Sequence, residues 1–220
     1  MNSSQVPALK QSVSDFFSTF PQQELPAKTV VLQEQVLLDS VYYIEEGVVC
    51  VKLLHERGNE VIVNILRAPS FFPLTAIVND TPNVYQFEAK TDLTIRIAPI
   101  GKVRKWLQSD LSLLWETLSR VLVGMNGQLE EKAVLMVGTS KQRLLQVLIQ
   151  LSRRFGAESG DTVVVSLPFT HAELASLIGI SRETVTREIS VLKDEGVIQS
   201  IQTGVIQLSF PELLEATDTL

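Results

Sequence analysis

The spacing of apolar residues divides the chain into stretches of different secondary structure. The first ~22 residues place phenylalanines at helical spacing and predict a short amphipathic helix that ends near Pro21. From about Glu24 to Pro99, β-branched runs alternate with turn residues about every ten positions, which is typical of an all-β barrel, roll or sandwich. The predicted strands are residues 28–32, 41–44, 48–54, 61–66, 85–89 and 93–97.

Turn residues inside this region predict where the chain reverses. Residues 55–59, which begin with His55, form a predicted hairpin loop, with Gly58 available for a positive φ. Prolines at positions 69, 73 and 82 predict a long connection rather than the interior of a strand.

From about Ile100 to Val137 the pattern becomes helical, with Asp110 as a predicted N-cap. Apolar residues repeat there at intervals of three and four, as in a coiled-coil seam. The seam residues are Leu111, Leu114, Leu118, Val121 and Met125. Gly124 and Gly127 each cost about 1 kcal/mol relative to alanine in a helix, which close approach of a partner helix or a ligand would explain. We favour a dimerisation helix over a core helix lying on the barrel.

A break at residues 138–140 separates this helix from the rest of the chain. Residues 141–155 predict another amphipathic helix, which ends at Gly156. We therefore expect an N-terminal β domain with flanking helices over residues 1–109, a dimerisation helix over 110–137 and a C-terminal domain over 138–220.

The most informative segment is residues 167–197, LPFTHAELASLIGISRETVTREISVLKDEGV. Thr170 with Glu173 three residues later forms a capping box at the start of a short helix, which Gly179 ends. Ser181 is a second N-cap, and the helix that follows runs from Arg182 to about residue 194. Two short helices joined by a tight glycine-containing turn predict a helix-turn-helix unit.

The second of these helices has two distinct faces. Val185, with residues 189 and 192, forms an apolar stripe, and Arg182, Glu183, Thr186 and Arg187 lie on the opposite face. Arginine can donate two hydrogen bonds to guanine, and glutamate can accept one from cytosine N4. The alternative is a solvated face with an incidental Glu183–Arg187 ion pair.

Residues 197–201 and 205–208 predict a hairpin around the turn Gln202-Thr203-Gly204, and residues 162–167 predict a further strand of the same wing. A helix-turn-helix followed by such a hairpin is a winged helix.

These motifs resemble the Crp/Fnr superfamily of bacterial transcription regulators, which includes the cyclic-AMP receptor proteins. Residues 181–187, SRETVTR, resemble the recognition-helix signature closely, and residues 42–49, YYIEEGVV, resemble the family's β-roll hairpin. The resemblance extends over nearly the whole chain. It implies an α+β fold with an N-terminal β-roll like the jelly roll of a cyclic-nucleotide-binding domain, a long dimerisation helix and a C-terminal winged helix-turn-helix.

The resemblance also implies which residues touch DNA. Arg182, Glu183 and Arg187 would contact bases, and Thr186 would influence which operator sequence is preferred. Ser181, Thr170 and His171 would contact phosphates from helix N-termini. The partners implied are a second copy of the chain, a pseudo-palindromic double-stranded operator with TGTGA-like half-sites, and RNA polymerase.

The expected effector site departs from the cyclic-nucleotide pattern. In cyclic-AMP-binding members a glutamate takes the ribose hydroxyl and an arginine pairs with the phosphate, but residues 69–76 contain no acid and residues 82–87 no arginine. A buried phosphate without a cation is costly, so cyclic-nucleotide binding in this manner is not expected. A pocket for another small, apolar or aromatic effector would use Phe71, Phe72, Leu74, Asn83, Tyr85 and Gln128. The alternative is that these side chains fill the roll and no effector exists.

The amino-acid composition argues against several kinds of cofactor and catalytic site. The single cysteine, Cys50, excludes an internal disulfide framework and an iron–sulfur sensor, and we expect it to be a small core residue. With two histidines, His55 in a loop and His171 on the helix-turn-helix, neither a metal site nor haem is supported, and no cofactor is predicted. The absence of a phosphate-binding glycine loop and of a basis for a catalytic triad disfavours an enzyme.

Charge and hydropathy complete the prediction. The net charge is −6, yet residues 139–206 hold 7 basic and 7 acidic side chains, so the predicted DNA-binding unit is neutral. DNA binding would therefore depend on the positions of its basic side chains and not on an excess of positive charge. Neither a signal peptide nor an apolar stretch of 18 residues is present, and we expect a soluble cytoplasmic protein. The alternatives to an effector-responsive regulator are a constitutive DNA binder and a module whose helix-turn-helix contacts protein.

Overall fold

A computed structural model describes residues 5–54, 60–79, 82–202 and 204–209 of the chain. The chain divides into two compact units, residues 1–123 and 124–220, with the boundary inside a long helix. The predicted domain limits at 109/110 and 137/138 remain predictions.

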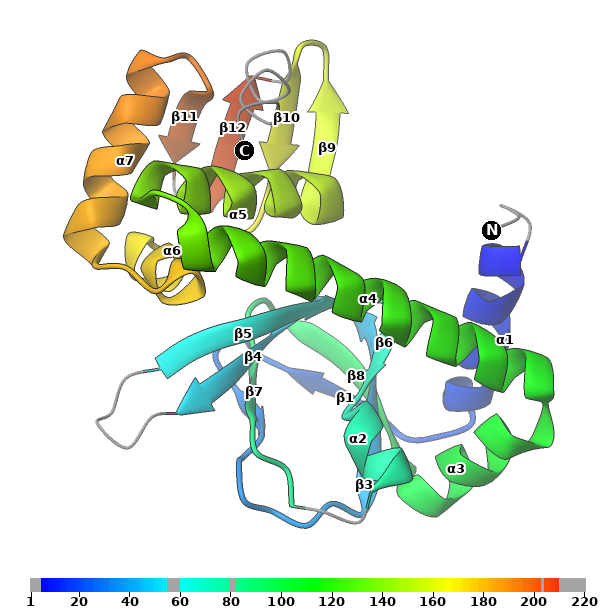
Figure 1. The fold of residues 1–220 in the computed structure, drawn as a ribbon. Coiled ribbons are helices and arrows are strands. Elements are labelled where there is room, and N and C mark those ends of the chain that lie inside the picture. Colours follow the sequence, from blue (N-terminus) through cyan, green and yellow to red (C-terminus); the bar gives the residue numbers. More distant parts are fainter. Residues whose placement is uncertain (1–4, 55–59, 80–81, 203, 210–220) are drawn as a thin grey trace. The chain divides into compact units, whose positions relative to one another are not determined.

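The first unit is a β-roll of two four-stranded antiparallel sheets, preceded by helix α1 (Gln5–Ser18) (Figure 1). One sheet has the order β1 (Gln22–Leu25), β8 (Leu93–Pro99), β3 (Ser40–Glu46) and β6 (Ser70–Phe72). The other has the order β2 (Val30–Leu32), β7 (Gln86–Ala89), β4 (Val48–Leu54) and β5 (Glu60–Arg67).

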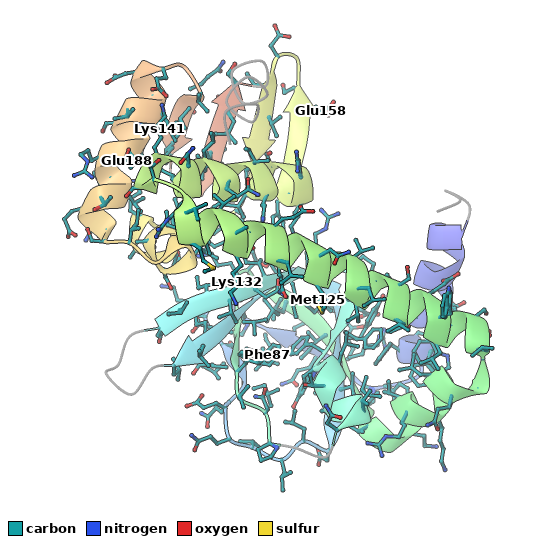
Figure 2. All side chains as sticks on the ribbon, viewed as in Figure 1. Phe87, Met125, Lys132, Lys141, Glu158 and Glu188 are labelled. Carbon is teal, nitrogen blue, oxygen red and sulfur yellow. The ribbon has the colours of Figure 1, made fainter. Side chains whose placement is uncertain are left out.

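Side-chain alternation along these strands builds the core of the roll. Val49 and Val51 on β4 pair with Ala89 and Phe87 on β7, and all four side chains are buried. The ring of Phe87, labelled within the roll in Figure 2, stacks on that of Phe72 with centroids 4.6 Å apart. Branched and aromatic side chains suit these strands because they pack well on a pleated surface.

Aromatic side chains hold the flanking helices of this unit on the roll. Phe16 of α1 stacks on Trp106 of α3 (Ile100–Ser109), with ring centroids 4.3 Å apart. Phe17 of α1 stacks on Tyr43 of β3 at 4.8 Å. The predicted N-terminal helix therefore exists, and its phenylalanines pack into a shared core.

The long helix α4 (Leu111–Val137) begins at the N-cap predicted from the sequence. The backbone N–H of Ser112 donates to Asp110 Oδ1 at 2.8 Å. Hydrogen bonds from the Ser112 hydroxyl and backbone hold the pKa of Asp110 below its usual range. The helical region from Ile100 to Val137 is thus two helices, because Asp110 has an extended backbone between them.

The second unit contains a four-stranded antiparallel sheet and three shorter helices. The sheet order is β11 (Ile198–Gln202), β12 (Val205–Ser209), β10 (Thr162–Val165) and β9 (Gly156–Ser159). The helices are α5 (Ser140–Phe155), α6 (His171–Ile178) and α7 (Arg182–Asp194). Helix α5 lies across the sheet and also contacts α6 and α7 (Figure 1).

The predicted break between α4 and α5 is confirmed, and a capping box explains where α5 begins. The backbone N–H of Gln142 donates to Thr139 Oγ1 at 3.3 Å, and the Thr139 N–H donates to Gln142 Oε1 at 2.9 Å. Gly138 has no room for a side chain, because a Cβ there would lie 2.6 Å from the Val134 carbonyl oxygen.

Several secondary-structure predictions were wrong. Residues 70–72, between two of the prolines assigned to a connection, form β6, whose Phe71 pairs with Tyr43 of β3. Strands β1 and β9 and the short helix α2 (Leu74–Val78) were not predicted. Lys28 was assigned to a strand, but its φ of 71° is left-handed and β2 starts two residues later.

The remaining expectations for this part of the chain have mixed outcomes. Cys50 lies on β4 and is buried, as predicted for a small core residue. The predicted loop at residues 55–59, with His55 and Gly58, lies outside the described residues, although β4 and β5 pair as a hairpin around it.

Among the described residues, no helix is long and apolar enough to cross a membrane, and no cluster of acids, histidines and cysteines could hold a metal ion.

Candidate nucleic-acid interface

Helix α6 is fixed at both ends by the residues that the sequence indicated. The Glu173 N–H donates to Thr170 Oγ1 at 3.2 Å, and the Thr170 N–H donates to Glu173 Oε2 at 2.8 Å. Gly179 ends the helix in the left-handed conformation with φ 67°, and its N–H donates to the Ala175 carbonyl. Glycine suits this position because it has no Cβ to clash there.

Helix α7 begins at Arg182, three residues after Gly179. The Thr184 N–H donates to Ser181 Oγ at 3.1 Å, which confirms Ser181 as the second N-cap. Val185, Ile189 and Leu192 are 0%, 4% and 0% exposed, so the predicted apolar stripe is the buried face of the helix. α7 packs against both α6 and α5.

The opposite face of α7 is exposed and polar, as the sequence predicted. Arg182, Glu183, Thr186 and Arg187 are all exposed, and they occupy the first two turns of the helix. Arg187 Nη2 lies 3.2 Å from Glu188 Oε1. Within the described residues the arginine therefore pairs with its neighbour, and the Glu183–Arg187 pair considered from the sequence is not formed.

Glu183 is held in its charged form. Hydrogen bonds from its own backbone N–H and from the Ser181 side chain, with a smaller contribution from Arg182, hold the pKa of Glu183 below its usual range. The carboxylate is therefore a hydrogen-bond acceptor at neutral pH.

The residues expected to contact phosphates lie at the starts of the two helices, but their hydroxyl groups are already engaged. Thr170 Oγ1 donates to Glu173 Oε2 at 2.9 Å in addition to accepting the capping bond. Ser181 Oγ lies 3.1 Å from Thr184 Oγ1. Phosphate contact at these two positions would therefore rely on backbone N–H groups, which helix N-termini present to anions.

Sequence reasoning missed a contact between the two helices. His171 Nδ1 lies 2.9 Å from Thr186 Oγ1, so the first residue of α6 touches the exposed face of α7. The two residues are fifteen positions apart, and no spacing rule within a single helix would connect them.

The predicted wing is present beside the helix-turn-helix. β11 and β12 pair from Ile198↔Leu208 to Gln202↔Val205, and β10 joins the other side of β12 as predicted. Thr203 of the turn lies outside the described residues.

A second long-range contact braces α7, because Lys141 Nζ at the start of α5 pairs with Glu195 at the end of α7; Lys141 is labelled in Figure 2.

The structure places the six residues of the predicted effector pocket in different surroundings. Phe71 and Leu74 pack with the aromatic side chains of α1 and α3, whereas Phe72 lies in the core of the roll. Asn83 is buried, and its Nδ2 donates to the carbonyls of Gln33 (2.8 Å) and Tyr85.

The two remaining pocket residues are exposed. Tyr85 is 36% exposed, and Gln128 lies on α4 in the second unit. The proposed pocket stays a prediction.

The five seam residues of α4 are exposed in the single chain. Their exposed fractions run from 42% for Leu114 and Val121 to 79% for Leu111. Gly124 and Gly127 have no neighbouring heavy atom within 4 Å of a hypothetical Cβ. Within the described residues, no steric contact therefore explains glycine at these two positions.

Both parts of the chain match known domain families. Residues 142–217 match the Crp-like helix-turn-helix domain, and residues 22–110 match the cyclic nucleotide-binding domain. These ranges contain the winged helix and the β-roll described above.

Individual relatives agree with these matches. The chain is 31% identical over 165 residues to the global nitrogen regulator of Synechocystis sp., which covers 73% of this chain and 72% of the relative. It is 32% identical over 170 residues to the transcriptional regulator SdrP of Thermus thermophilus, covering 77% and 79%. A crystal structure of a CRP/FNR-family transcriptional regulator from Thermus thermophilus is similar, with a TM-score of 0.73 and 29% identity over 90% of this chain and 98% of that one.

Proposed function

The chain belongs to the Crp/Fnr family of transcriptional regulators, and from this premise we propose that it binds a palindromic operator in a sequence-specific manner as a homodimer. The observation that carries the proposal is the exposed face of α7, where two arginines and a charged glutamate lie on a helix whose other face is buried. A helix held in this way can enter the major groove with its first turns at the base edges.

The roles of the exposed residues follow from their chemistry. Arg182 and Arg187 can each donate two parallel hydrogen bonds to guanine O6 and N7, and the Glu183 carboxylate can accept one from cytosine N4. The N-termini of α6 and α7, with His171, would contact phosphates and fix the register of the helix on the duplex. Because the 7 basic side chains of residues 139–206 are balanced by 7 acidic ones, the non-specific affinity of this region for DNA should be modest.

Dimerisation would occur through the α4 seam. An exposed row of leucine, valine and methionine at heptad spacing is the arrangement that a partner helix covers in a coiled coil. Two copies related by a two-fold axis would place two α7 helices on half-sites about one helical turn apart, 10–10.5 base pairs.

The β-roll is proposed to respond to an effector other than cyclic AMP. The family's phosphate-binding arginine has no counterpart in residues 82–87, and the amide of Asn83 in that stretch is bonded to backbone carbonyls. A thermal-shift screen with cyclic nucleotides and a metabolite panel tests this, since a ligand that binds only the folded chain raises Tm. A rise in Tm with cyclic AMP would contradict the proposal. We also propose that the regulator contacts RNA polymerase.

The experiment that tests sequence-specific binding compares two labelled duplexes by fluorescence anisotropy at several salt concentrations. One duplex carries the operator selected from the organism's own promoters, and the other carries the same bases in scrambled order. We expect tighter binding to the operator and a loss of affinity for both as salt rises. Equal affinity for the two duplexes, or affinity unaffected by salt, would contradict the proposal.

A further inference from the structure

His171 is the first residue of α6, and its side chain contacts the exposed face of α7. Its Nδ1 lies 2.9 Å from Thr186 Oγ1. The Thr186 hydroxyl in turn donates to the Arg182 carbonyl oxygen at 3.0 Å, one turn back in α7. The imidazole ring is partly exposed, beside side chains that are proposed to approach DNA.

These two bonds determine which ring nitrogen carries a hydrogen in the neutral ring. A hydroxyl group has one hydrogen, and a carbonyl oxygen can only accept. Because Thr186 gives its hydrogen to the Arg182 carbonyl, His171 Nδ1 carries a hydrogen and donates it to Thr186 Oγ1. Nε2 has no hydrogen-bond partner among the described residues, and it is the nitrogen that takes up a proton when the ring becomes charged.

The position of the ring at a helix N-terminus separates the free protein from the DNA complex. The N-terminus of a helix carries partial positive charge, which disfavours a second positive charge there. A DNA phosphate at the same place reverses this preference. Neutral Nε2 presents only a lone pair to a phosphate oxygen, whereas protonated Nε2 donates a charge-assisted hydrogen bond. Binding of DNA should therefore be linked to uptake of a proton from water.

Charged side chains on the two helices of the motif act on the ring in opposite directions. On α6, the Glu173 carboxylate is bonded to Thr170. On α7, Arg182 and Arg187 disfavour a charged ring and Glu183 favours it, and all three share the exposed face with Thr186.

The other elements near α6 add no acidic group to this balance. Helix α5, which packs against α6, contains four cations and no acid. Lys141 pairs with Glu195, Arg143 donates to the Gly138 carbonyl, and the other two cations lie in the last turn of α5. Strands β11 and β12 contain no charged residue. Because all these charges are present with and without DNA, the arrival of phosphates is the change that favours the charged ring.

We propose that protonation of His171 at Nε2 strengthens operator binding, so that the affinity of the regulator for DNA rises as pH falls from 8 to 6. This inference rests on the proposed function and adds a regulatory input to the same site. The bond to Thr186 keeps Nδ1 turned toward the protein and leaves Nε2 for a phosphate.

The test measures Kd for a duplex selected by the wild-type protein, by fluorescence anisotropy at pH 6, 7 and 8 and constant salt. We expect the wild-type Kd to be about fivefold lower per half-site at pH 6 than at pH 8, the difference between a charge-assisted and a neutral hydrogen bond. His171→Gln can still donate to Thr186 but takes up no proton, so its Kd should not change with pH. His171→Arg stays charged and should bind at pH 8 about as tightly as the wild type binds at pH 6.

The salt dependence of Kd identifies the partner of the charged ring. If Nε2 binds a phosphate, the plot of log Kd against log salt should be steeper at pH 6 than at pH 8 by about one counterion per half-site. His55→Gln, which removes the other histidine of the chain, is the matched control and should keep the wild-type response to pH.

Two results would overturn the inference and leave the proposed function standing. One is a wild-type protein that prefers its selected duplex equally at all three pH values. The other is a His171→Gln or His171→Arg variant whose Kd changes with pH as the wild-type Kd does. Equal affinity for selected and scrambled duplexes at every pH would instead remove the proposed function, and the inference with it.

Discussion

Arg187 illustrates what a single side chain contributes to the proposed readout. It is exposed in the second turn of α7, and its contact with Glu188 at 3.2 Å is a pair between an exposed group and a partly buried one. The Arg187 side chain is 68% exposed, so solvent screens the pair and the guanidinium can exchange this partner for a guanine. A bidentate contact with guanine is the stronger interaction.

The first prediction concerns this arginine. Arg187→Ala should weaken binding to the preferred operator by about 1–3 kcal/mol and relax the preference at one guanine. Lys193→Ala, at the other end of α7, removes a charge without removing a proposed base contact and serves as the control. Anisotropy titrations with the operator and with single-base variants measure both effects. An equal loss on operator and scrambled DNA would rule out base readout by Arg187.

Residues whose roles depend on their immediate neighbours in the chain could be predicted from the sequence. Thr170 with Glu173, and Ser181 with Thr184, cap their helices because the bonds span three positions. The contact between His171 and Thr186 could not be predicted, since it depends on how α6 crosses α7.

At the scale of single elements, α7 depends on the apolar stripe that faces α5 and α6. Leu192 is fully buried and lies five residues beyond Arg187, the last residue of the exposed readout face. Its side chain therefore supports the orientation of the helix without touching DNA.

The second prediction follows from this burial. Leu192→Ala should lower the free energy of unfolding by about 2–5 kcal/mol, the usual cost of a cavity left by a core leucine. Urea unfolding followed by circular dichroism measures the change. An effect below about 0.5 kcal/mol, the range of surface substitutions, would mean that the stripe is not a packed core.

Helix α4 carries a titratable group in its contact with α5. Burial raises the pKa of Glu131, although a hydrogen bond with Gln150 and the charge of Arg154 act in the opposite direction. A carboxyl group with a raised pKa in the folded state favours the protonated form. Its contribution to stability is therefore fully present below the usual pKa of 4.5 and is lost as pH rises above that value.

The third prediction follows from the raised pKa of Glu131. Glu131→Gln removes the charge and keeps a side chain that can bond to Gln150, so Tm should rise at pH 7, and the gain should disappear near pH 4. Differential scanning calorimetry of both proteins across this range checks it. Glu130→Gln, the adjacent exposed residue, is the control. A variant that is less stable than wild type at pH 7 would contradict the assignment.

Elements with a strong local pattern were predicted from sequence, and those that depend on distant pairing were not. The seam of α4 and the stripe of α7 have helical periodicity, and both helices occur as expected. β6 has three residues between two prolines, and it is a strand because it pairs with β3, some thirty residues earlier. Short strands of this kind carry too little periodicity to be identified in isolation.

At the scale of the whole molecule, the proposed regulator needs two copies of the chain. The seam of α4 leaves Leu118 46% exposed and Met125 51% exposed. Covering these side chains with a second α4 would remove apolar surface from water, which favours association.

The fourth prediction tests this association. Leu118→Glu places a charge in the seam and should convert a dimer into a monomer, as measured by sedimentation equilibrium. Val123→Glu adds the same charge to the same helix at a position off the seam, where the side chain is 63% exposed, and should leave the dimer intact. A wild-type protein that sediments as a monomer, or a Leu118→Glu variant that remains a dimer, would contradict dimerisation through the seam of α4.

The most direct test of sequence-specific binding is selection of bound duplexes from a random DNA library by the full-length protein. We predict enrichment of two inverted half-sites whose centres lie about 10–10.5 base pairs apart or a multiple of that. We also predict that an Arg182→Ala/Arg187→Ala double variant fails to prefer the enriched sequence over scrambled DNA. The absence of any enriched motif, or undiminished preference in the double variant, would contradict the assignment of α7 as the reading helix.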